Sequence, residues 1–178
     1  MTDSLAKPPD SGDAFPEYEL AGIETIARGI CVKDGHVLIC RNRKVGNLYF
    51  PGGHIEFGET GAEALVREVR EEMGVESSAR EFLGCCEHRF GQHGKPHAEI
   101  NLVYALEIPS LAPGKAVPSC EDWIAFEWMP LADLAGSAVE PAVLRRCAAD
   151  WHAARASAAD RLVTTPAWFR VFAQGRRT

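Results

Sequence analysis

The sequence has no apolar run long enough to cross a bilayer. Its longest apolar stretches, such as 37–40, are short or interrupted, well below the roughly 20 residues that a spanning helix needs. The N-terminus lacks a positive region followed by an apolar core, so we predict no secretory signal. None of the six cysteines forms a C-x-x-C pair, and most lie in apolar runs, a pattern typical of free thiols in a reducing compartment. We therefore predict a cytoplasmic protein without a membrane segment.

An excess of basic residues is also absent. The 178 residues include 19 Lys and Arg against 25 Asp and Glu, which gives a formal net charge of −6. A protein that binds nucleic acid regardless of sequence normally carries a basic surface, so we predict no such binding. What is present is the composition of an ordinary globular protein, with 46% hydrophobic and 25% charged residues.

The length suits one domain. We place it over residues 17–156, after a mobile tail at 1–16 that contains proline, glycine and aspartate. The last segment, 157–178, contains an apolar cluster made of Trp168, Phe169, Val171 and Phe172. Because soluble proteins usually cover such clusters, we expect this segment to dock on its own domain or on a partner subunit. The second option implies a homodimer.

Turn signals and changes in periodicity predict an α/β fold. Two apolar, β-branched runs, 23–32 and 36–41, flank Asp34-Gly35, a pair typical of tight turns, and so predict a β-hairpin. Further strands are expected over 47–50, 80–90, 97–108 and 124–128, with a loop at 91–96, and helices over 130–134 and 140–155. Strands and helices mix without strict alternation, which favours layers of helices around a mixed sheet.

Residues 62–73 have the clearest helical pattern, because three apolar side chains recur every four residues: Leu65, Val69 and Met73. The pattern also has a start and a stop. Thr60 and Glu63 have capping-box spacing, and Gly74 is placed to end the helix. We therefore predict an amphipathic helix with one apolar face.

The same helix carries three carboxylates toward one side. Glu68, Glu71 and Glu72 lie at positions i, i+3 and i+4, a spacing at which like charges repel. A hard divalent cation such as Mg²⁺, which takes oxygen ligands, would turn that repulsion into coordination. Arg67 is placed to orient the carboxylates. The pattern favours a metal site over its alternative, an acidic face in solvent.

Together these residues resemble the Nudix box, the signature of the Nudix hydrolases. Every fixed position of the box is filled, in the order Gly53-x5-Glu59-x7-Arg67-Glu68-Val69-x-Glu71-Glu72-x-Gly74-Val75. The order of the predicted elements extends the resemblance over residues 23–150. It implies an α/β/α sandwich with a mixed sheet, and hydrolysis of a nucleoside diphosphate linked to another group X by attack of water on phosphorus.

The resemblance also implies roles for individual residues. Mg²⁺, or Mn²⁺ in its place, would take as ligands the carbonyl of Gly52 and the carboxylates of Glu68, Glu71 and Glu72. Glu59 and Arg67 would then fix the orientation of those carboxylates. The general base is open among Glu68, an acid in the loop before the last strand (Glu121 or Asp122), and Glu99.

The substrate is a small nucleotide or nucleotide sugar under this interpretation, and its identity stays open. We expect it to be bound by Arg41, Arg43, Gly53 and Phe57. A second interpretation is a non-catalytic Nudix-fold sensor that binds a nucleotide. The complete box favours the enzyme, whereas the aromatic C-terminal segment is the one feature that favours the sensor.

Overall fold

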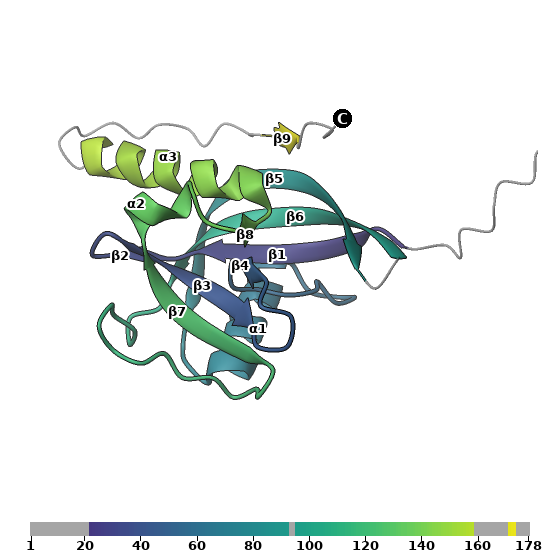
Figure 1. The fold of residues 1–178 in the computed structure, drawn as a ribbon, viewed down its shortest axis with the longest axis horizontal. Helices are drawn as coiled ribbons and strands as arrows, with labels where there is room; N and C mark the ends of the chain where they lie inside the picture. Colours follow the sequence, from purple (N-terminus) through teal and green to yellow (C-terminus); the bar gives the residue numbers. More distant parts are fainter. Residues whose placement is uncertain (1–21, 93–94, 159–170, 174–178) are drawn as a thin grey trace, which may run out of the picture.

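The computed structural model describes residues 22–92, 95–158 and 171–173. One sheet contains, in spatial order, β1 (Glu24–Ile30), β6 (Lys95–Glu107), β5 (Ser78–Gln92) and β9 (Val171–Ala173). The other contains β2 (Val32–Lys33), β3 (His36–Asn42), β4 (Leu48–Tyr49) and β8 (Val139–Glu140), with β7 (Ile124–Pro130) also paired to β3. The helices are α1 (Gly61–Met73), α2 (Leu131–Leu134) and α3 (Ala142–Ala158) (Figure 1).

The predicted hairpin is much shorter in the structure. The turn at Asp34-Gly35 pairs only β2 with the start of β3. β1 instead runs parallel to β6 over its whole length, and β3 pairs antiparallel with β7 over seven residues, from His36 to Asn42. The single mixed sheet expected from the sequence is therefore two sheets. A turn dictates the pairing of the residues beside it, whereas the partner of a whole strand depends on burial across the domain.

The loop predicted at 91–96 is also mostly strand. β5 continues to Gln92 and β6 begins at Lys95, with Gly91 opposite Pro96 in the antiparallel register. These two strands form a long ribbon that extends away from the helices (Figure 1).

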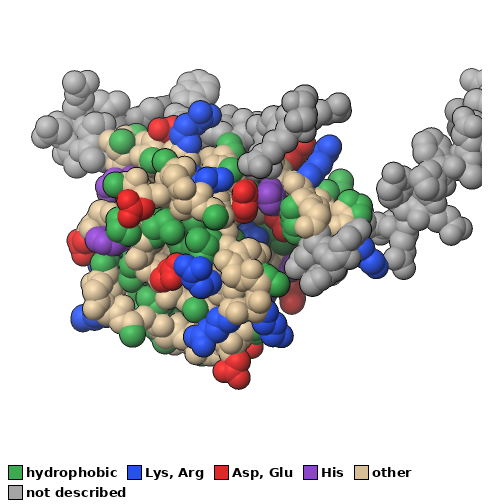
Figure 2. All heavy atoms as spheres, in the orientation of Figure 1, with side chains coloured by type: hydrophobic (Ala, Val, Ile, Leu, Met, Phe, Trp, Pro, Cys, Tyr) green, Lys and Arg blue, Asp and Glu red, His purple; other side chains and the backbone are tan. Residues whose placement is uncertain are grey.

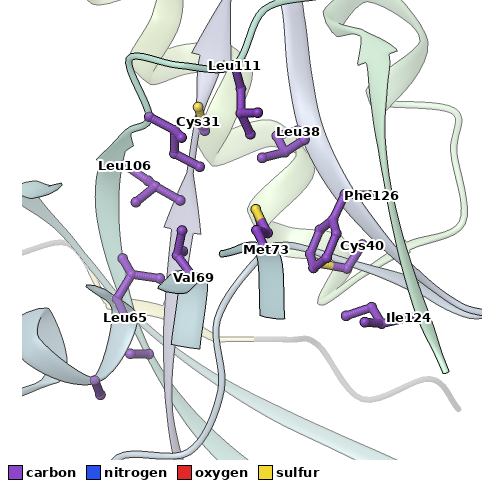
Figure 3. Close-up of a cluster of buried hydrophobic side chains, with 13 residues drawn as sticks. Cys31, Leu38, Cys40, Leu65, Val69, Met73, Leu106, Leu111, Ile124 and Phe126 are labelled. Atoms are coloured by element: carbon purple, nitrogen blue, oxygen red, sulfur yellow. The ribbon is translucent and has the colours of Figure 1, made fainter. Parts of the chain in front are cut away.

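Two apolar cores lie on opposite sides of the sheets, and β3 contributes to each of them. Val37, Leu38, Ile39 and Cys40 are all fully buried. Because successive side chains of a strand point to opposite faces, Leu38 and Cys40 pack in a cluster with α1, and Val37 and Ile39 pack in a cluster with α3. Figure 3 shows the first cluster, in which Met73 lies among the strand residues. The predicted α/β/α sandwich is confirmed.

The predicted caps of α1 are present. Thr60 Oγ accepts the N–H of Glu63 at 3.3 Å, and the Glu63 carboxylate accepts the N–H of Thr60 at 2.8 Å. At the other end Gly74 adopts φ 68°, a left-handed conformation, and donates its N–H to Arg70 O at 2.9 Å. The buried apolar face seen in the sequence, from Leu65 to Met73, fixes the helix against the first core.

Within the described ranges, none of the helices combines the length and the apolar character that a bilayer crossing needs. Acidic and basic side chains are interspersed on the face drawn in Figure 2. At the far edge, β9 pairs in parallel with β5, and Val171 lies opposite Cys85. Trp168 and Phe169 lie outside the described residues, as does the tail at 1–16, so the docking of the last segment and the homodimer stay predictions.

Candidate active site

The three carboxylates of α1 lie in different environments. The side chain of Glu71 is 55% exposed and that of Glu68 is 17% exposed, whereas Glu72 is only 7% exposed. Burial, followed by repulsion from Glu68, raises the pKa of Glu72 to about 8, and the charge of Arg28 offsets part of this rise. Oε2 of Glu72 is buried without a hydrogen-bond partner in the described structure. Ionised Glu72 therefore calls for a further cation.

Arg67 links this acidic face to the loop before α1. Its Nε and Nη2 donate to the two oxygens of Glu59 at 3.1 and 2.7 Å, and Nη1 donates to Glu68 at 2.9 Å and to Glu71 at 3.0 Å. Nη2 also donates to the carbonyl of His54 at 2.9 Å. All five guanidinium donors are thus used. The hydrogen bonds from Arg67 lower the pKa of Glu59, so this carboxylate stays ionised.

We expect Arg67→Lys to weaken metal binding more than it lowers the stability of the fold. A lysine keeps the charge but not the planar fork, so it cannot hold Glu59, Glu68 and Glu71 at once. The Mg²⁺ concentration for half-maximal rate is expected to rise about tenfold, measured by titrating Mg²⁺ at saturating substrate. Arg70→Lys, an exposed change on the same helix, is the control. Unchanged metal dependence in Arg67→Lys would show that Arg67 does not position the carboxylates.

The turn at Gly52-Gly53 requires two glycines for different reasons. Gly52 has φ 130°, and a Cβ built on it would lie 2.0 Å from the carbonyl oxygen of Ala27 in β1. A Cβ on Gly53 would lie 2.3 to 2.7 Å from the carboxylate atoms of Glu68. The turn therefore packs its backbone against a strand on one side and against an acidic side chain of α1 on the other.

Arg28, which the sequence interpretation missed, reaches the same turn from β1. Its side chain is 11% exposed, and its Nη1 donates to the carbonyls of Phe50 at 3.2 Å and Gly52 at 3.3 Å. The available signal was a single charged residue inside the apolar run that begins at Ile26. A single charged residue of this kind is equally typical of the solvent-facing side of an edge strand. The sequence therefore did not distinguish a buried arginine at the site from an exposed one.

Two further predicted residues, Glu121 and Arg41, lie outside both α1 and the glycine turn. Glu121 is exposed, and its charge contributes to the raised pKa of Glu72, whose carbonyl accepts the N–H of Cys120 at 2.7 Å. Arg41 forms a salt bridge of 2.6 Å with Glu127 across the β3–β7 pair, so its charge is already partnered.

Two predicted substrate contacts are solvent-exposed. The side chain of Arg43 is exposed, and its backbone N–H donates to Trp123 O at 2.8 Å. The side chain of Phe57 is fully exposed, one residue before Gly58, which has φ 94°. Glu121 is thus near the three carboxylates of α1, Glu68, Glu71 and Glu72, which we call the acidic cluster. Arg41 is paired with Glu127, whereas Arg43 and Phe57 are accessible to a ligand.

The acidic cluster suits a divalent cation, although no cage is formed in advance. In the part of the chain that the structure describes, no three His, Cys, Asp or Glu side chains stand close enough to enclose a metal ion. Arg67 contacts only one oxygen each of Glu68 and Glu71. The second oxygens, together with the unpartnered Oε2 of Glu72, are ligands of the kind that Mg²⁺ prefers.

The metal-free protein is expected to lose stability as pH rises, because of Glu72. Its pKa is about 8 when folded against an ordinary value of 4.5, so between these values the folded state holds a proton that the unfolded chain has released. The free energy of unfolding therefore falls as pH rises from about 4.5 and levels off above about 8, by a few kcal/mol.

Urea unfolding in EDTA at pH 5, 7 and 9 tests this, with Glu72→Gln as the reference that cannot ionise. The difference in unfolding free energy between Glu72→Gln and the natural protein should grow with pH. A difference that is constant across the three pH values contradicts the expectation.

Comparisons with known proteins agree with this geometry. The NUDIX domain family model matches residues 24–149. An isopentenyl-diphosphate Delta-isomerase of Cereibacter sphaeroides is 28% identical over 127 residues, which cover 67% of this chain and 71% of the relative. An ADP-ribose pyrophosphatase of Methanocaldococcus jannaschii is 39% identical over 59 residues, 32% of this chain and 35% of the relative.

Among solved structures, a NUDIX hydrolase from Nitrosomonas europaea superposes with a TM-score of 0.56 at 19% identity, covering 75% of this chain and 90% of that one. This likeness shows the fold. The family match spans most of the chain, including the acidic helix, the arginine and the glycine turn described above. The chain therefore belongs to the Nudix family.

Proposed function

We propose that the protein is a Mg²⁺-dependent pyrophosphohydrolase that cleaves a nucleoside diphosphate linked to another group X. The observation that carries this proposal is the buried Glu72, whose Oε2 lacks a hydrogen-bond partner in the described structure while Glu68 lies close enough to raise its pKa. A buried carboxylate with no partner is stabilised by a metal ion. Nudix hydrolases generally use divalent cations, and Mn²⁺ is an expected substitute here.

The proposed ligands are the carbonyl of Gly52 and the carboxylates of Glu68, Glu71 and Glu72. When bound, the cation would neutralise the charge of the pyrophosphate and lower the pKa of a coordinated water. Arg67, braced by Glu59, orients the carboxylates through the hydrogen bonds described above. Glu121, exposed and within electrostatic reach of Glu72, is our choice to accept the proton from the attacking water.

Substrate contacts follow from what is accessible around this cluster. The exposed guanidinium of Arg43 suits a phosphate, and the exposed ring of Phe57 suits stacking on a base. Gly53 lets a phosphate approach the backbone closely. Arg41 would contribute only after leaving Glu127. The ADP-ribose pyrophosphatase among the relatives makes a nucleoside diphosphate sugar our first choice of substrate class.

A second candidate function is isomerisation of a diphosphate, because the isomerase relative is matched over 67% of this chain. Such a reaction moves a proton on carbon and leaves the diphosphate intact. Hydrolysis and isomerisation therefore differ in whether a P–O bond is broken.

The test is a substrate panel in Mg²⁺: ADP-ribose, a UDP-sugar, nucleoside triphosphates and isopentenyl diphosphate, in ¹⁸O-labelled water, followed by ³¹P NMR and mass spectrometry. We expect a nucleoside monophosphate together with a sugar phosphate or pyrophosphate, with ¹⁸O on the phosphorus that water attacks. Conversion of isopentenyl diphosphate without label incorporation would instead establish the isomerase. Binding of a nucleotide without any turnover would establish the sensor.

A further inference from the structure

Arg28 is a buried cation that the mechanism above does not use. Its side chain is 11% exposed, in a strand where it projects to the face of the sheet that carries Asn101. A buried charge is costly unless its surroundings pair with it. What surrounds the guanidinium therefore indicates what the residue does.

The turn before α1 offers three consecutive carbonyls, and the main chain of β1 binds two of them. Pro51 O accepts the N–H of Gly29 at 2.8 Å, and Gly53 O accepts the N–H of Ala27 at 2.9 Å. The carbonyl of Gly52, between them, has no such partner in β1. It accepts instead from Nη1 of the buried guanidinium at 3.3 Å. A carbonyl oxygen has two lone pairs, so this contact leaves one for a metal ion.

The guanidinium is itself held in place from behind. Its Nε donates to Oδ1 of Asn101 at 3.2 Å, and Asn101, which is fully buried, donates through Nδ2 to Glu99 at 3.2 Å. Glu99 is 8% exposed and lies 3.9 Å from Nη2 of Arg28. The ring of Tyr49 faces the guanidinium carbon, with its centroid 5.3 Å away. Asn101 and Glu99, which are themselves joined by a hydrogen bond, brace the guanidinium. Together with Tyr49 they hold it in one orientation.

We propose that Arg28, braced by Asn101 and Glu99, is a positioning residue for the metal site that fixes the direction of the Gly52 carbonyl. The inference rests on the proposed function, in which that carbonyl is a metal ligand. Arg28 and Arg67 then orient different ligands of the same site. Arg67 orients side-chain ligands from the solvent side of α1, and Arg28 orients the backbone ligand from within the sandwich.

The test is direct binding of Mn²⁺ to the nucleotide-free protein. Binding is measured by the loss of the electron paramagnetic resonance signal of free Mn²⁺. We expect Arg28→Met to raise the dissociation constant at least about tenfold, as changes to groups that orient metal ligands usually do. Arg28→Lys keeps the positive charge but not the planar fork of donors, so we expect a smaller rise. Asn101→Ala leaves the guanidinium unbraced and should change binding in the same direction.

Arg145→Lys is the matched control. Arg145 is 17% exposed, donates from Nη1 to the carbonyl of Ser137 and pairs with Glu140 at 3.6 Å, but it lies on α3. Its replacement should leave Mn²⁺ binding unchanged.

The rate of hydrolysis gives a second readout. For the Arg28 variants the Mn²⁺ concentration for half-maximal rate should rise, with most of the maximal rate recovered at saturation.

The inference is overturned if Arg28→Lys and Asn101→Ala bind Mn²⁺ as tightly as the natural protein or Arg145→Lys. These two variants decide the question if Arg28→Met does not fold. Failure of the natural protein to bind Mn²⁺ and to hydrolyse any substrate would instead refute the proposed function. The two failures are thus distinguishable.

Discussion

Replacing Glu72 with glutamine is expected to lower turnover at least about a hundredfold while the fold is kept. Glutamine matches the volume of glutamate but supplies no negative charge. At this buried position Oε2 has no hydrogen-bond partner in the described structure, so under the proposed function the charge would serve a bound cation and not a protein donor. The same change should stabilise the metal-free protein at high pH, so activity and stability are expected to move in opposite directions.

Steady-state rates in saturating Mg²⁺ and thermal unfolding in EDTA measure the two effects. Glu63→Gln is the control, because a glutamine can also complete the capping box of α1 and the Glu63 carboxylate is engaged with Thr60 at the start of the helix. Turnover of Glu72→Gln close to that of Glu63→Gln would remove Glu72 from the set of metal ligands.

Alanine at the two glycines of the turn is expected to separate stability from activity. Gly52→Ala places a Cβ 2.0 Å from a backbone oxygen of β1, at a φ of 130°. Neither the strand nor the turn can yield cheaply, so we expect a loss of about 2–4 kcal/mol in unfolding free energy. Gly53→Ala meets the carboxylate of Glu68 instead, and that side chain can rotate away.

Gly53→Ala should therefore fold with a nearly unchanged melting temperature and lose at least about tenfold in turnover, because Glu68 leaves the place where Arg67 holds it. Thermal unfolding and kinetics of the two variants give the comparison. Gly136→Ala, where a Cβ has no neighbour nearer than 4.0 Å, is the control. A stable Gly52→Ala, or a fully active Gly53→Ala, contradicts this account of the turn.

Local features of the site were readable from spacing. The helix α1, its capping box and its final glycine depend on residues three or four apart, and such contacts follow directly from helical geometry. The hydrogen bond between Arg67 and Glu71, also four residues apart, belongs to this class. For the same reason the turn at Asp34-Gly35 was predicted correctly for the residues beside it.

The partners of whole strands were not readable in this way. The run that begins at Ile23 predicts equally well a strand paired to its neighbour in sequence or one paired to β6, more than seventy residues later. Burial decides between them, because β3 is covered on both faces and takes β7 as its long partner. The sequence pattern of Arg41 likewise gives no sign of Glu127, its partner across that pair.

By itself the sequence determined the acidic helix, its arginine and the glycine turn, since the resemblance that identifies the family rests on fixed local spacing. Only the tertiary structure decided which carboxylate is buried, with Glu72 enclosed while Glu71 remains half exposed. It alone brought Arg28 to Gly52 and Asn101, the latter 73 residues away. The physical reason is that charge, burial and hydrogen bonding at a site depend on distances between elements, and these are set by packing rather than by the period of any one helix or strand.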